Sequence, residues 1–266
     1  MKKLVFLMAV SITLSLVAGT AMAQLSLHSL RATGVQQPEK APKAPKYCNP
    51  CLFYGGDWNS GSSDWVIFAN ADGAGFGGLV QLYNSFTVPT GSTWSVTGVF
   101  ANIGFINIDT ISPKKGEWDI RKGMKAGHGG KSLGHGKTKA TTKATGRTAD
   151  SGAGEVTEYT VLVGSLPSAV SLTAGTYYED VTPPCDSTKD SSCSSALYYE
   201  TDTFNNNETA QGAHHFGPKE AAGKNFQNGA AFGLDYQQIN GDYCTSLGYP
   251  SVACNWLSAG VIGTSN

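Results

Sequence analysis

Short apolar stretches alternate with clusters of turn-forming residues from residue 47 to the end of the chain, at intervals of about ten to twenty residues. Almost no stretch has the 3.6-residue period of a helix. The 33 glycines and the low charged content, 15%, also disfavour long helices. The sequence therefore predicts an all-β protein, a two-sheet antiparallel sandwich of jelly-roll type with about ten short strands. We expect strands at 65–69, 79–83, 86–88, 93–100, 117–121, 158–163, 176–181, 196–201, 231–236 and 258–262.

Two tryptophans follow the two-residue period of a half-buried strand. Trp94 shares a strand face with Val96 and Phe100, and Trp118 alternates with charged neighbours. We therefore expect both indole rings in the core rather than at a ligand site.

The first 23 residues have the three regions of a secretory signal peptide: a lysine-containing start, an apolar run over 4–17 and a small-residue cleavage signal over 21–23. The apolar run is too short for a membrane span, so we expect a secreted protein, extracellular or periplasmic. Residues 24–46 are rich in proline and lysine at their end and are interpreted as a linker or disordered tail. Residues 47–266 are expected to form a single domain.

The six cysteines all follow the expected cleavage site, and an even number in an exported protein favours disulfides. Sequence alone allows fifteen pairings. Bridges between near neighbours are expected because each such pair brackets a short turn-forming segment. These pairs are Cys48 with Cys51, Cys185 with Cys193, and Cys244 with Cys254.

Five segments together resemble a group of secreted bacterial β-sandwich proteins of unassigned function, some of them related in pattern to ectodomains with C-terminal sorting tails. The segments are FTVP at 86–89, WSVTGVF at 94–100, EWDIRKG at 117–123, TEYT at 157–160 and LTAGTYY at 172–178. The resemblance is one of strand pattern over residues 47–266 and brings no active site with it. Glu179 and Asp180 stand where such proteins usually have aliphatic residues, and the absence of a sorting helix before Asn266 favours release over anchoring.

Charge is distributed unevenly along the chain. Residues 114–147 carry ten basic side chains against two acidic ones, a formal charge of +8, whereas residues 150–266 carry −10. The basic stretch, with Lys131, Lys137, Lys139 and Lys143, is a candidate site for a polyanion. The alternative is a mobile, solvated hairpin loop. Nucleic acid is disfavoured because no aromatic residue lies between Trp118 and Tyr159 to stack on bases.

Four aromatic residues are not explained by the alternation of a core strand: Trp58, Trp65, Tyr198 and Tyr199. Trp58 lies among glycines and polar residues, so its ring is our first candidate for stacking on a sugar. The alternative is that this ring closes one end of the sandwich.

Catalytic and metal motifs are weak. GKSLG at 130–134 fits the nucleophile motif G-x-S-x-G but lacks the flanking strand and helix, and the glycine motif at 73–78 precedes a strand, which excludes a dinucleotide site. We assign no catalytic residue and expect no cofactor. Structural Ca²⁺ is one alternative, with oxygen ligands from Asp202, Asn205 and Glu208, and zinc at His214 and His215 is weaker because neighbours on a strand point to opposite faces.

These patterns favour a secreted, non-catalytic binding or surface-associated module for a glycan or another envelope polymer. The sequence leaves open a polysaccharide-acting hydrolase, which the fold would permit, and a purely structural extracellular protein.

Overall fold

The computed structural model describes residues 29–36, 45–56, 58, 65–73, 78–106, 114–150, 154–183, 197–203, 224–246 and 256–266. The strands are β1 (Ser29–Gln36), β2 (Cys51–Tyr54), β3 (Trp65–Ala69), β4 (Ala71–Gly73), β5 (Gly78–Ile106), β6 (Lys115–Lys122), β7 (Lys131–Lys139), β8 (Thr141–Asp150), β9 (Glu155–Val163), β10 (Val170–Thr182), β11 (Leu197–Thr203), β12 (Asn225–Gly229), β13 (Leu234–Ile239), β14 (Trp256–Leu257) and β15 (Ala259–Ser265). The helical elements are the 3₁₀ helix η3 (Ala230–Phe232) and the helix α3 (Gly241–Ser246).

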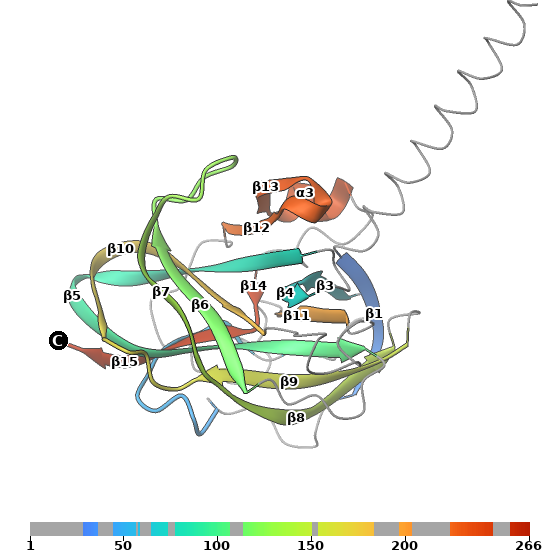
Figure 1. Ribbon diagram of the computed structural model, residues 1–266, viewed down its shortest axis with the longest axis horizontal. Coiled ribbons are helices and arrows are strands. Elements are labelled where there is room, and N and C mark those ends of the chain that lie inside the picture. Colours follow the sequence, from blue (N-terminus) through green and yellow to red (C-terminus); the bar gives the residue numbers. More distant parts are fainter. Residues whose placement is uncertain are drawn as a thin grey trace, which may run out of the picture.

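The protein is all-β, as the sequence predicts. Its strands pair antiparallel in one hydrogen-bonded network, whose main path runs β14-β11-β3-β1-β8-β9-β5-β10-β6-β7 (Figure 1). This network is an open sheet of fifteen strands, and its hydrogen bonds do not separate it into the two sheets that we expected.

The longest strand, β5, joins three segments that the sequence presents as separate strands. It runs over 29 residues and pairs with β10 on both sides of a bend, with a register shift between Thr173 and Gly175. Gly91 in β5 has a φ of 84° and Gly175 in β10 a φ of 145°, values that disfavour other residues. Both strands therefore bend at the same place, and glycine permits the bend in each.

An aromatic stack fills the inside of this bend. The rings of Phe86 and Trp94 are 6.1 Å apart and almost parallel, although about 26 Å of straight strand would separate the two residues. Phe53 of β2 and Tyr177 of β10 extend the stack. The two arms of β5 thus enclose a common apolar core between them.

The two tryptophans expected in the core are there, since Trp94 is 3% exposed and Trp118 is 5% exposed. Trp58 does not have the exposed, sugar-stacking position that we considered for it. Its side chain is 0% exposed and belongs to the same core cluster. Of the two roles considered for Trp58, the exposed sugar-stacking ring is wrong, and the burial agrees with the alternative of a ring that packs against the core. The polar neighbours of Trp58 suggested a surface turn, but the tertiary fold packs its indole among apolar side chains.

Most of the basic stretch, residues 114–147, forms strands and is not the mobile hairpin loop that we considered. Residues 131–139 and 141–150 form β7 and β8, which pair with β6 and β9. Threonine, lysine and glycine have little apolar pattern, so the strands were not visible in the sequence. Part of the segment interpreted as a linker, 29–36, is strand β1, paired with β3 and β8.

The Cys48–Cys51 disulfide is confirmed, with an S–S distance of 2.02 Å. Cys244 is disulfide-bonded and buried, and its expected partner Cys254 lies outside the described residues. The expected bridge between Cys185 and Cys193 also lies outside them, as does the expected signal peptide. Within the described part of the chain, no helix has the length and apolar character needed to cross a membrane.

Replacing Trp58 by alanine should destabilise the fold by about 3–5 kcal/mol, because the change leaves a cavity in the core. Leu79→Ala is the control, since Leu79 is the exposed large apolar residue of β5, and its replacement should change the free energy of unfolding by about 0.5 kcal/mol or less. Urea unfolding of the two variants measures both values. A Trp58→Ala protein as stable as the parent would contradict the burial of this ring.

Candidate functional site

The β6–β7 hairpin forms one end of the strand path and carries the candidate site. In Figure 1 both strands run obliquely across the view, and the connection between them projects beyond the sheet. Glu117 lies opposite Lys137, Trp118 opposite Gly136, and Asp119 opposite His135. Since side chains alternate along a strand, the hairpin has an apolar inner face and a charged outer face.

On the inner face the indole of Trp118 lies under β7. A Cβ atom added to Gly134 or Gly136 would approach this ring to 3.3 Å, and one at Gly134 would also meet Val170 at 2.8 Å. Glycine at both positions therefore allows β7 to pack closely over the ring.

On the outer face the carboxylate of Asp119 is the centre of a hydrogen-bond cluster. Its Oδ1 accepts a hydrogen bond of 2.7 Å from the Ser132 hydroxyl, and its Oδ2 accepts one from Tyr83 and an ion-paired one from Arg121. Nδ1 of His135 lies 3.3 Å from the Ser132 hydroxyl oxygen. Asp119 is buried, so these donors offset the loss of its hydration.

Arg121 is held between two aromatic rings. Its guanidinium carbon lies 5.5 Å from the ring centre of Tyr83 and 5.6 Å from that of Tyr236, and it donates a hydrogen bond to the carbonyl of Gly129. Burial lowers the pKa of Arg121, but the hydrogen bond to Asp119 and nearby negative groups raise it above its usual value overall. The side chain is therefore a fixed cation.

Tyr83 and Tyr236 differ in their constraints. Burial, together with the carboxyls of Asp180 and Asp119, raises the pKa of Tyr83 far above its usual range, so this phenol stays a hydrogen-bond donor. Tyr236 has a φ of 45°, a strained backbone conformation for an aromatic residue. The strain is located where its ring covers Arg121.

A second carboxyl, that of Asp180, lies opposite Asp119 on the neighbouring strand β10. It is 0% exposed. It accepts hydrogen bonds from the side-chain amide of Gln81 at 3.1 Å and from the backbone N–H of Leu82 at 3.2 Å. Burial raises the pKa of Asp180 to about 7, against the lowering effect of hydrogen bonds from Thr182, Gln81 and Leu82.

The partners of Thr182 agree with a protonated Asp180. The Thr182 hydroxyl oxygen lies 2.9 Å from an Asp180 oxygen and 2.8 Å from Oδ1 of Asn70, while the Asn70 amide nitrogen donates to the Val181 carbonyl. A hydroxyl has one proton to donate. If Thr182 donates it to Asn70, a protonated Asp180 can donate in turn to Thr182.

An open groove of about 430 Å³ lies over this cluster, and we call it the Asp119 groove. An ion pair between Lys137 and Glu117, with an N–O distance of 2.6 Å, closes one side. The groove is lined by Gln81, Glu117, Trp118, Asp119, Arg121, Ser132, His135, Gly136 and Lys137.

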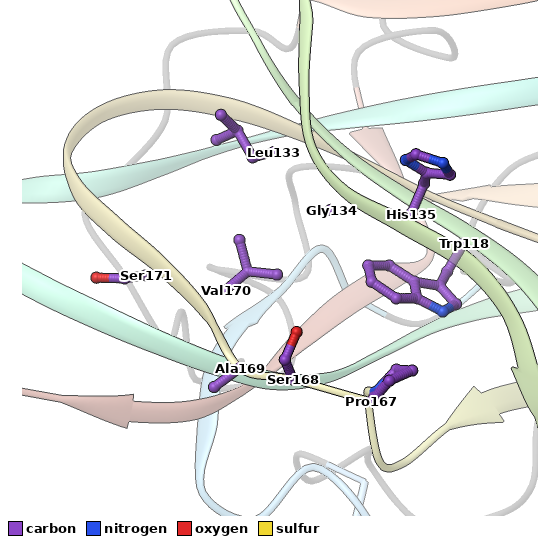
Figure 2. A pocket seen from close by; sticks show the side chains of 9 residues that line it. All are labelled: Trp118, Leu133, Gly134, His135, Pro167, Ser168, Ala169, Val170 and Ser171. Carbon is purple, nitrogen blue, oxygen red and sulfur yellow. The ribbon is translucent and has the colours of Figure 1, made fainter.

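A second cavity of about 300 Å³, which we call the Trp118 pocket, lies between β7 and the segment that leads into β10. Figure 2 shows the Trp118 indole on one side of this pocket, with Pro167 and Ser168 along the segment below and Val170 and Ser171 farther along it. Nε1 of Trp118 is buried and has no hydrogen-bond partner among the described residues. Leu133, Pro167 and Val170 give this pocket apolar walls.

The lysines expected to hold a polyanion are spread over both faces and two strands. Lys131 and Lys139 are exposed at the ends of β7, Lys137 lines the Asp119 groove, and Lys143 is exposed on β8. Only Lys137 therefore belongs to the groove itself.

The other predicted site residues are not part of the groove. Trp65 lies in β3, and Tyr198 and Tyr199 lie in β11, but their side chains are outside the described part. Among the calcium candidates, Asp202 lies in β11, and Asn205 and Glu208 lie outside the described residues. Within the described residues, no three His, Cys, Asp or Glu side chains are grouped as metal ligands.

Arg121 and His135 belong to the basic stretch that the sequence offers as a polyanion site, whereas Asp119 and Asp180 were not predicted as site residues. One signal was present: in EWDIR, the alternation that buries Trp118 also places Glu117, Asp119 and Arg121 together on the opposite face. Ser132, in the rejected GKSLG motif, lies within β7 and donates to Asp119, so it is not a nucleophile on a strand-to-helix turn.

No protein-family model, no curated protein and no solved structure matches this chain. The site is therefore interpreted from its own geometry.

The pKa of Asp180 predicts a pH dependence of stability. The folded pKa, about 7, exceeds the unfolded value of about 4, so the folded protein retains a proton that the unfolded chain has lost. The contribution of protonated Asp180 to the free energy of unfolding is complete below about pH 4, and it is lost as the pH rises to about 7. The free energy of unfolding of the Asp180→Asn variant, measured relative to that of the parent, should therefore rise by up to a few kcal/mol between about pH 4 and pH 7. Parallel pH profiles of the two proteins would contradict the assignment.

Proposed function

We propose that this protein is a secreted, non-catalytic binding module for an acidic glycan, which binds in the Asp119 groove. The observation that carries the proposal is the lining of the groove: fixed donors and acceptors on a rigid sheet, next to lysines that have no acidic residue opposite them. The sequence features that favour export and the resemblance to secreted β-sandwich proteins are consistent with this role.

The polar groups of the groove suit sugar hydroxyls. A sugar hydroxyl both donates and accepts hydrogen bonds, and Arg121, Ser132 and His135 offer both kinds of partner, while buried Asp119 holds Arg121 and Ser132 in place. The groups hold one another in place through their own hydrogen bonds. Such preorganisation reduces the entropy lost on binding.

The charge of the outer face favours an acidic ligand. Glu117 is paired with Lys137, and Asp119 is paired with Arg121. The remaining lysines on this face of the hairpin are Lys115 and Lys139. These two lysines are exposed and lie directly opposite each other on β6 and β7. Like charges at opposite positions are unfavourable, and a carboxylate or sulfate between them would relieve the repulsion.

The finer architecture also belongs to the proposal. We place the network in a two-sheet sandwich of jelly-roll type, supported by the shared bend of β5 and β10 and by the aromatic stack inside it. The β6–β7 hairpin then lies at the edge of one layer, where an extended polymer has access.

A polysaccharide-acting hydrolase is the second candidate. Asp119 and Asp180 are opposite one another on neighbouring strands, and the pKa of Asp180 is raised to about 7, as for a catalytic acid. Against it, Asp180 is completely buried behind Gln81, and its oxygens are used by hydrogen bonds. Release of reducing ends from polygalacturonate, lost in Asp180→Asn, would favour the hydrolase.

Binding should be measured on polygalacturonate, alginate and hyaluronate, with methyl-esterified polygalacturonate as the uncharged comparison. We expect retention on at least one acidic polymer that falls as salt rises, and weak retention on the ester. His135→Ala changes an exposed side chain of the groove and should weaken binding without loss of fold. Equal retention on the acid and the ester would contradict an acidic ligand.

The lysine pair can be tested separately. Lys115→Gln with Lys139→Gln should weaken binding about three- to tenfold at low salt and flatten its salt dependence. Lys143→Gln is the matched control, because Lys143 is an exposed lysine of the same basic stretch on a different strand. If Lys143→Gln has the same effect as the pair, the basic stretch acts through its total charge and not through the groove.

A further inference from the structure

The Asp119 groove and the Trp118 pocket are adjacent. Trp118 and His135 line both, and the remaining β7 residues are Gly134 and Leu133 in the pocket and Ser132, Gly136 and Lys137 in the groove. The two cavities therefore flank one short stretch of β7.

This stretch of β7 is a sheet edge. The strand path ends at β7, and within the described part of the chain β7 pairs with β6 alone. An edge strand presents N–H and C=O groups on its outer side. The edge between the two cavities can thus hydrogen-bond to sugar hydroxyls.

The Trp118 pocket has features of a ligand site in its own right. Its volume, about 300 Å³, is at the lower end of the range for small-molecule pockets. Leu133, Pro167 and Val170 provide apolar contact for the carbon face of a sugar ring.

We propose that the ligand occupies both cavities: one sugar in the Asp119 groove, the next across the edge at Gly134–Gly136, and a further sugar in the Trp118 pocket. This inference rests on the proposed function and adds that the site recognises an oligosaccharide rather than a single acidic sugar. The groove supplies recognition of charge, and the Trp118 pocket supplies apolar contact. Linking two weak subsites by one chain raises affinity with ligand length.

The experiment is a titration with galacturonate and oligogalacturonates of two to five residues, followed by NMR. For the parent protein we expect affinity to rise at least tenfold between the monomer and the tetramer. Ser168→Phe, which places a ring in the Trp118 pocket, should remove most of this gain while the monomer affinity stays within about twofold.

Ser165→Phe is the matched control, because Ser165 is exposed in the same segment and does not line the pocket. Circular dichroism confirms that both variants fold. Affinity that does not depend on length, or a tetramer affinity unchanged by Ser168→Phe, overturns the second subsite while leaving the groove intact. If the parent is retained on none of the three acidic polymers, the proposed function fails and this inference fails with it.

Discussion

The bend shared by β5 and β10 is the constraint on which the rest of the structure depends. Without it, a strand of 29 residues would extend far beyond the size of a small domain, with no partner for much of its length. The bend brings Phe86 and Trp94 of one strand face to face and gives each arm of β5 its own set of partners. The same pairing carries β10 onward to β6, and β6 to β7, so it also positions the candidate site.

The site itself depends on how buried charge is compensated. Asp119 is buried, and a buried carboxylate without hydrogen-bond partners would be very unfavourable. Arg121, Tyr83 and Ser132 donate hydrogen bonds that replace its lost hydration. Asp180 is accommodated in another way, since its pKa is raised to about 7 and its proton can satisfy Thr182. The two carboxyls lie opposite each other, and the charge of Asp119 is one of the causes that raise the pKa of Asp180.

The close contact between Trp118 and β7 links the core to this surface. Because Gly134 and Gly136 have no side chains, the strand can lie over the indole, and the ring forms a wall of both cavities. One tryptophan that the sequence correctly predicts to be buried is therefore also part of the candidate site. Burial and function are not alternatives for such a residue, because one face of the ring can pack in the core while its edge lines a cavity.

The sequence by itself determined the all-β class, the burial of Trp94 and Trp118 and the Cys48–Cys51 bridge, because alternation and a three-residue spacing are local properties. The tertiary structure alone decided the burial of Trp58 and the formation of β7 and β8. It also brought Asp180 to Asp119, which is distant in the chain. These features depend on which strands become neighbours, and strand pairing is set by contacts between distant residues that no local pattern contains.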